Sequence, residues 1–157
     1  MSDTRTPKDA MIYCERKGQL LPLQEIDKEF IQSVIELSNA DVESGKKIMQ
    51  GLDDTSTLWS NVYAAYYDAL HKLVDAYVRF DRITSLNHLC LYAYICEKHP
   101  ELELNWEFFE RVRTKRNGVH YYAQKATRND WKEVEIQFYV YIKTMKKSVE
   151  EKLKNLR

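Results

Sequence analysis

A run of large apolar and aromatic residues with helical spacing lies between residues 56 and 80, and it leaves the chain few folds to choose from. Its members recur at intervals of 4, 3, 4, 3 and 4 positions: Trp59, Tyr63, Tyr66, Leu70, Leu73 and Tyr77. This period places them on one stripe of an α-helix and is typical of helices packed in bundles. The spacing predicts a helix over residues 56–80, about 37 Å long. Thr55 or Ser56 is its expected cap.

Further helices are expected on both sides of this one. Only four glycines and three prolines occur in the chain, so long helices with few tight turns are favoured. A first helix is expected from near Gln24, a third capped by Ser85 and a fourth capped by Asn105. The last helix is expected to begin with a capping box made by Asp130 and Glu133.

The predicted fold class is therefore all-α, a four- to five-helix up-and-down bundle in one domain. The bundle is expected to occupy residues 24–157. Residues 1–23 are predicted to be an irregular N-terminal lead-in, because Pro7, Gly18 and Pro22 interrupt them and no apolar period is evident.

The three cysteines, Cys14, Cys90 and Cys96, are odd in number and lack the spacing of a disulfide framework. Free thiols in a reducing cytoplasm are the expected state. Residues 1–9 are polar and do not resemble a signal peptide, and the longest apolar run is too short to cross a bilayer. These features predict a cytoplasmic protein without a membrane partner.

One stretch combines cations, a histidine and two phenols. It contains Arg111, Arg113, Lys115, Arg116, Asn117, His120, Tyr121 and Tyr122. Residues 105–128 hold six Lys or Arg against two acids, a local excess of +4 in a chain of zero net charge. In a helix, Arg113, Arg116 and His120 share one face. Such a face suits a phosphate-bearing partner, although a solvated basic helix is an equal alternative. The Asn117–Gly118 step leaves open whether the helix continues or breaks there.

No metal site or cofactor is expected. The chain has no Glu-x-x-His pair, no glycine-rich phosphate loop and no nucleophile elbow. His71 and His88 are interpreted as structural histidines, because each lies next to apolar helical positions.

Metal-free cleavage of RNA needs a base, an acid and cations that stabilise the phosphorane. Histidine serves as base or acid near neutral pH, and arginine binds phosphate oxygens in pairs. One copy of the basic stretch supplies one imidazole, so a nuclease built on it is expected to be a homodimer with two copies in one cleft.

Two blocks of the chain resemble the HEPN superfamily of small all-α domains. Residues 63–76, followed by Ser85–Leu91, are similar to the family's long helix and to the start of its next helix. Residues 116–122 are similar to its Arg-Asn…His motif. In the family, four to six residues separate the arginine from the histidine. Three separate Arg116 from His120 and six separate Arg113 from His120, so either Arg113 is the motif arginine or Arg116 is, with Tyr121 in the histidine's place.

The resemblance implies a metal-independent endoribonuclease that acts as the toxin of a toxin–antitoxin pair. The implied catalytic residues are Arg116, His120, Asn117 and Arg113, and Arg111, Lys115, Tyr121 and Tyr122 are implied to bind nucleotide or RNA. A nucleotidyltransferase-type antitoxin is an implied partner. The family also contains inactive members, and the alternative is a non-catalytic nucleotide- or RNA-binding or dimerisation module.

Overall fold

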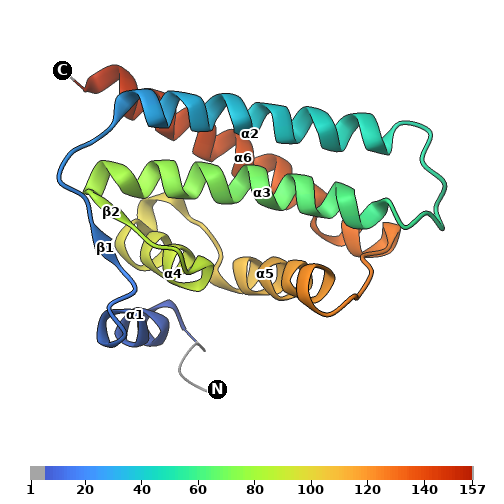
Figure 1. The fold of residues 1–157 in the computed structure, drawn as a ribbon, viewed down its shortest axis with the longest axis horizontal. Helices are drawn as coiled ribbons and strands as arrows, with labels where there is room; N and C mark the ends of the chain where they lie inside the picture. Colours follow the sequence, from blue (N-terminus) through green and yellow to red (C-terminus); the bar gives the residue numbers. More distant parts are fainter. Residues whose placement is uncertain (1–5, 157) are drawn as a thin grey trace.

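A computed structural model describes residues 6–156 of the chain (Figure 1). The α-helices are α1 (Pro7–Arg16), α2 (Lys28–Met49), α3 (Trp59–Val78), α4 (His88–Lys98), α5 (Trp106–Tyr121) and α6 (Arg128–Asn155). Single 3₁₀ turns, η2 (Arg79–Asp81) and η3 (Pro100–Leu102), precede β2 and α5. The all-α prediction is confirmed, and the exception is a two-residue antiparallel pairing of β1 (Leu21–Pro22) with β2 (Ile83–Thr84). None of the helices within residues 6–156 has the length and apolar character to cross a bilayer.

Helix α3 is the spine of the bundle, as its spacing predicted. All six residues of the stripe are buried, and Tyr63 and Tyr66 contact the aromatic rings of Trp131 and Phe138 on α6. Helix α2 also packs along α3, whereas α4 and α5 pack on a different side of it (Figure 1). The helix is shorter than predicted, and Leu58 at its N-cap position makes no side-chain capping bond. Helix α3 is therefore covered on one side by α2 and α6 and on another by α4 and α5. Its residues can contribute to a site on either side.

The capping predictions are correct for one helix and displaced for others. Asn105 caps α5 by accepting a hydrogen bond from the Phe108 backbone N–H at 2.7 Å. The capping box of α6 is formed by Thr127 and Asp130, and not by Asp130 and Glu133. Asn87 caps α4, while Ser85 accepts a bond from the Asn87 backbone N–H. Capping residues are frequent near these helix starts, and only the chain geometry selects among them.

The prediction of an irregular lead-in is wrong for residues 7–16, which form α1. The Thr6 hydroxyl caps this helix by accepting from the Asp9 backbone N–H, and Pro7 occupies its first turn. Ala10, Met11 and Cys14 are buried where α1 packs against α4. A helix of 10 residues is marginal alone, so these tertiary contacts stabilise it.

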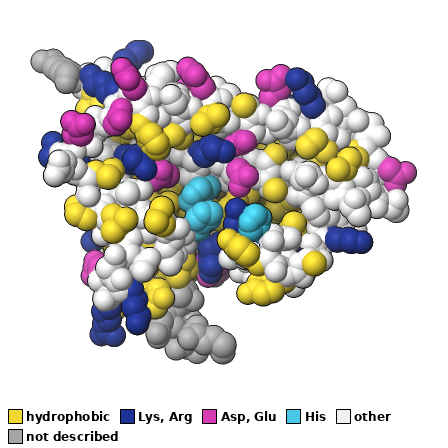
Figure 2. Space-filling model, in the orientation of Figure 1, with side chains coloured by type: hydrophobic (Ala, Val, Ile, Leu, Met, Phe, Trp, Pro, Cys, Tyr) yellow, Lys and Arg dark blue, Asp and Glu magenta, His cyan; other side chains and the backbone are white. Residues whose placement is uncertain are grey.

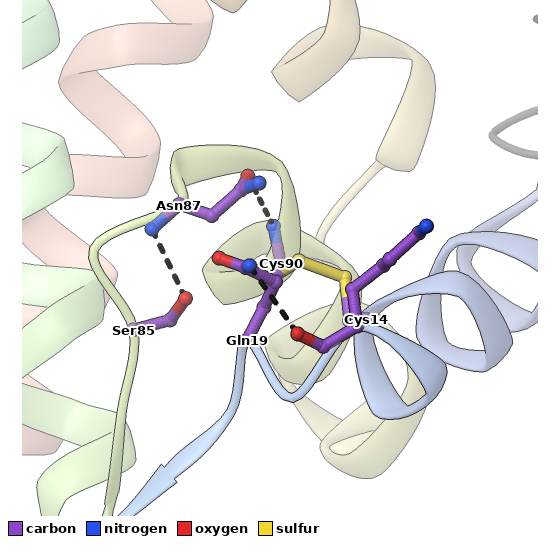
Figure 3. The surroundings of a disulfide bond; sticks show 6 residues. Cys14, Gln19, Ser85, Asn87 and Cys90 are labelled. Atoms are coloured by element: carbon purple, nitrogen blue, oxygen red, sulfur yellow. Dashed lines mark hydrogen bonds between the residues drawn. A yellow bond between two sulfur atoms is a disulfide. The ribbon is translucent and has the colours of Figure 1, made fainter.

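The expectation of three free thiols is also wrong, because Cys14 and Cys90 form a disulfide with a Cα–Cα distance of 5.8 Å. Figure 3 shows the bond linking α1 to the first turn of α4, beside the Asn87 cap. Cys96 remains a free thiol. The two half-cystines are 76 positions apart and meet only because α1 folds onto α4, so their spacing gave no sign of the pair. Cysteine usage therefore no longer supports a reducing cytoplasm, and the cytoplasmic location stays a prediction.

Candidate functional site

The basic stretch lies on α5, which continues through the Asn117–Gly118 step to Tyr121. Gly118 is buried because the following loop folds back over it. The Gln124 backbone N–H donates to the Gly118 carbonyl, and a Cβ atom at this position would lie 2.1 Å from the Gln124 side-chain oxygen. A larger residue at position 118 would therefore collide with the Gln124 side chain unless that side chain moved, so the glycine allows the loop to pack closely against α5.

The four residues with predicted catalytic roles line two neighbouring cavities. One, of about 110 Å³, is lined by Asp68 of α3 and by Arg116 and His120 of α5, among others. The second, of about 210 Å³, is lined by His88 of α4 and by Arg113, Arg116 and Asn117. Arg116 lines both cavities and is the only residue within 6–156 that they share.

Two of the predicted binding residues lie on a different side of α5. Arg111 and Lys115 line a cavity of about 440 Å³ together with Asp130 and Glu133 of α6. This cavity shares Tyr63 of α3 with the cavity that contains His120, but it shares no residue of α5 with either of the two that contain Arg116. The structure thus divides the basic stretch into a face toward α3 and α4 and a face toward α6.

Ion pairs neutralise most of the excess positive charge that the sequence indicated. Arg111 pairs with Glu133, Arg113 with both oxygens of Glu110, Lys115 with Asp130, and Arg128 with Asp54. Three of these acids lie outside residues 105–128, so the count over that window missed them. Arg116 and Lys125 form no ion pair with any residue of 6–156. Arg116 instead lies over the Tyr67 ring, with its Cζ 5.5 Å from the ring centroid. It is the cation left available to an anion at the two cavities.

The structure brings together two histidines that were interpreted as structural. The imidazole rings of His71 and His88 stack with their centroids 3.8 Å apart. The Tyr67 hydroxyl hydrogen-bonds His88 Nδ1 at 2.9 Å, and the Tyr92 hydroxyl hydrogen-bonds His71 Nδ1 at 3.3 Å. Histidine side chains accordingly gather at the centre of the face in Figure 2, with Lys or Arg and Asp or Glu side chains beside them.

A sequence signal for this cluster exists in retrospect. Tyr67 and His71 on α3 are four residues apart, and so are His88 and Tyr92 on α4. Each pair lies on one face of its helix, in opposite order. When α3 and α4 pack together, the reversed order places each tyrosine against the histidine of the other helix.

Burial keeps the cluster uncharged. Burial, followed by the neighbouring His88, Arg116 and Lys72, lowers the pKa of His71 to about 3. Burial and the cations Arg116 and Arg113 lower the pKa of His88 to about 4. Burial likewise raises the pKa of Tyr67 to about 12 and raises that of the Asp68 carboxyl. At neutral pH both imidazoles are therefore neutral, and each keeps one ring nitrogen that can accept a hydrogen bond.

We expect the stability of the protein to fall as the pH is lowered from 7 to 5. The folded pKa values of His71 and His88 lie below the unfolded value of 6.5. At pH values between the folded and the unfolded pKa, the unfolded chain therefore binds more protons than the folded protein. The stabilisation is complete above pH 6.5 and is lost progressively toward pH 4 and 3. His71 alone contributes a loss of about 2 kcal/mol in unfolding free energy by pH 5.

Urea denaturation at pH 7 and pH 5 measures this effect. His71→Gln removes one of the two titrating groups and should reduce the difference between the two pH values. His120→Gln, at an exposed position, is the matched control and should leave the difference as in the wild type. An equal pH dependence in all three proteins would contradict the assignment.

The two phenols at the end of α5 are exposed. Tyr121 is 65% and Tyr122 is 73% exposed, and Tyr121 lies edge-on to the His120 ring and lines the cavity that contains His88. Both rings are accessible to a partner, but only Tyr121 is placed beside the predicted catalytic face.

Within residues 6–156, no group of three or more His, Cys, Asp or Glu side chains is arranged to hold a metal ion. Comparison with known proteins found no matching family model, no matching curated protein and no matching solved structure. The candidate site therefore stands on its own geometry, and the HEPN resemblance stays a prediction.

Proposed function

We propose that this protein is a HEPN-like, metal-independent endoribonuclease. The observation that carries the proposal is the position of Arg116, which has no acidic partner within residues 6–156. It lines one cavity together with His120 and a second together with His88. A phosphodiester bound to Arg116 lies between the two cavities, with one imidazole available from each. In-line displacement places the attacking and leaving oxygens on opposite sides of phosphorus, so a base and an acid are needed on opposite sides.

The environments of the two histidines suggest how the roles divide. Burial and two arginines hold His88 neutral, so it carries no proton at pH 7 and can take the proton of the 2′-hydroxyl, although its lowered pKa makes it a weaker base than a solvated histidine. His120 is exposed and lines the other cavity that Arg116 shares, from which it would give a proton to the leaving 5′-oxygen. The 2′-oxygen then bonds to phosphorus as the bond from phosphorus to the 5′-oxygen breaks. The products are a 2′,3′-cyclic phosphate and a 5′-hydroxyl.

Other parts of the proposal concern partners. His88 supplies a second imidazole within one chain, so the chemistry no longer demands that two copies share one cleft. Homodimerisation and a nucleotidyltransferase-type antitoxin remain part of the HEPN-like proposal. The exposed hydroxyls of Tyr121 and Tyr122 are accessible to such an enzyme.

A second candidate is a non-catalytic RNA- or nucleotide-binding module. It is favoured by the exposed rings of Tyr121 and Tyr122 next to Arg116 and Asn117 on the last turns of α5. Aromatic rings beside cations bind unpaired bases by stacking and need no acid or base.

His120→Ala should lower the rate of RNA cleavage by about 10²–10⁴-fold, because a general acid or base is lost. The measurement uses purified protein, a single-stranded RNA and EDTA, with the product ends identified by mass spectrometry. His99→Ala is the matched control, since His99 pairs with Asp81 and Glu101 and lines neither of the two cavities. It should cleave at the wild-type rate if it remains folded.

The same experiment separates the two candidates. Wild-type protein that binds the RNA without cutting it, with affinity falling as salt rises, would favour the binding module. Wild-type protein that neither cuts nor binds would contradict both, and the face of α5 would then be a solvated surface.

A further inference from the structure

Another cavity, a groove between α2 and α6, lies on a different part of the bundle from the candidate nuclease site. It has a volume of about 740 Å³, and its lining residues come from α2, α3 and α6. Tyr66 of α3 belongs to this groove, whereas Tyr67 and Asp68 face the candidate nuclease site. Figure 1 shows α2 and α6 extending along the length of α3. The groove shares no lining residue with the cavities around Arg116.

Lysines dominate the charge of this groove. Lys46 of α2 and Lys143 and Lys146 of α6 line it, and none of the three pairs with an acid within residues 6–156. The one acid in the lining, Glu43, already pairs with Lys47 at 3.1 Å. Three ammonium groups around one hollow, without an acidic partner, favour a ligand with several negative charges.

The walls between the lysines are apolar and aromatic. Val42 and Ile142 line two sides, and the rings of Tyr66 and Tyr139 lie edge-on to each other with centroids 5.5 Å apart. A volume of this size is in the range of small-molecule sites, which combine mostly apolar walls with a few polar groups. A ligand could therefore place a flat or apolar part against these walls while its charged part contacts the lysines.

Tyr66 has a second property that points to a ligand. The side chain is completely buried. Its hydroxyl lies near that of Tyr139, but it makes no hydrogen bond of normal geometry in the described part of the chain. Buried tyrosine hydroxyls normally have a partner. The Tyr66 ring packs closely on two sides. A Cβ atom on Gly45 would lie 2.5 Å from Tyr66 Cε2, and the Trp131 ring lies tilted against it with the ring centroids 4.6 Å apart. Tyr139 is 41% exposed, so this wall can turn and admit a ligand to the Tyr66 hydroxyl.

We propose that the groove between α2 and α6 binds a small phosphate-bearing molecule with a flat apolar portion. Lys46, Lys143 and Lys146 contact the phosphate, and Tyr66 and Tyr139 contact the flat portion. The Tyr66 hydroxyl gains the hydrogen-bond partner that it lacks. This site is separate from the proposed nuclease site, and its occupation does not depend on RNA cleavage.

Isothermal titration calorimetry of the full chain with three probes tests the proposal. 1-Naphthyl phosphate carries both charge and ring, inorganic pyrophosphate carries charge alone, and 1-naphthol carries the ring alone. 1-Naphthyl phosphate should bind more tightly than either of the others. Equal binding of pyrophosphate would show a plain cationic surface, and absence of binding by 1-naphthyl phosphate at millimolar concentration would show no site. Either result would overturn the proposal.

Variants locate the binding. The double variant Lys143→Gln/Lys146→Gln should weaken 1-naphthyl phosphate by at least about tenfold, because two charged hydrogen-bond donors are lost. Lys147→Gln/Lys154→Gln makes the same charge change on the same helix outside the lining, and it should leave affinity within about twofold. If the two double variants weaken binding equally, the net charge of the protein alone would explain the effect. That result would contradict a specific site in the groove. Tyr66→Phe should weaken binding several-fold while its melting temperature without ligand stays at or above that of the wild type.

Discussion

Arg116→Ala should lower RNA cleavage by about 10²–10³-fold, the loss typical of removing one donor that stabilises transition-state charge. Arg116 is shared by both cavities and pairs with no acid in the described part of the chain, so its guanidinium is free to bind a phosphate. Arg113→Ala should have a milder effect. Nε and Nη2 of Arg113 donate to the two carboxylate oxygens of Glu110, at 2.9 and 3.0 Å, and the pair is mostly buried.

This comparison resolves which arginine belongs to the HEPN-like motif. A mild loss in Arg113→Ala and a large one in Arg116→Ala would assign the motif to Arg116. Comparable losses would assign it to Arg113 with His120, which have six residues between them. Arg116→Lys refines the test, because lysine keeps the charge but loses the paired donors of guanidinium.

A charge-matched control is available at the start of α6. Arg128→Ala also removes one arginine, but Arg128 pairs with Asp54 and lines neither cavity around Arg116. It should cleave RNA at close to the wild-type rate. If it loses as much activity as Arg116→Ala, general attraction for RNA explains both losses and the specific role of Arg116 is contradicted.

The helices were predictable where burial is periodic. The stripe from Trp59 to Tyr77 predicted α3 because each member is buried, so hydrophobic spacing reports the packing directly. Arg113, Arg116 and His120 were placed on one face of α5 for the same geometric reason. The limits of the helices were less predictable, since several capping residues stand near each start.

The contacts between helices were not predictable in the same way. His88 reaches His71 only because α4 packs on α3, and Lys115 meets Asp130 only because α6 begins beside α5. A charge count over residues 105–128 does not include acids that the fold brings in from outside that window. Of the six cations in the predicted basic patch, four are paired, and Arg116 and Lys125 have no acidic partner within residues 6–156. His88, which was interpreted as structural, lines the site, with His71 stacked on it.

Helix α1 was missed for a related reason. Its 10 residues show too short an apolar period to indicate a helix, and its stability depends on contacts with α4 and on the Cys14–Cys90 bond. Neither the packing nor the pairing is visible in a sequence where the two cysteines are 76 positions apart.

Removing the disulfide should therefore have the largest effect on stability. The double variant Cys14→Ala/Cys90→Ala should lose about 2–5 kcal/mol in free energy of unfolding, because the crosslink closes a loop of 76 residues and restricts the unfolded chain. Both cysteines are completely buried, so the variant is a cleaner test than a reductant, which reaches a buried bond slowly. Urea denaturation at pH 7 measures the change.

The matched control is Cys96→Ala, which removes the free thiol. Cys96 is partly buried, so its loss should cost about 1 kcal/mol or less through packing alone. A thiol count in denaturant without reductant gives an independent check. One reactive thiol per chain is expected, because only Cys96 is free, and three would contradict the disulfide. With three thiols, α1 would be stabilised on α4 only by the buried contacts of Ala10 and Met11, and the double variant should then unfold at nearly the wild-type urea concentration.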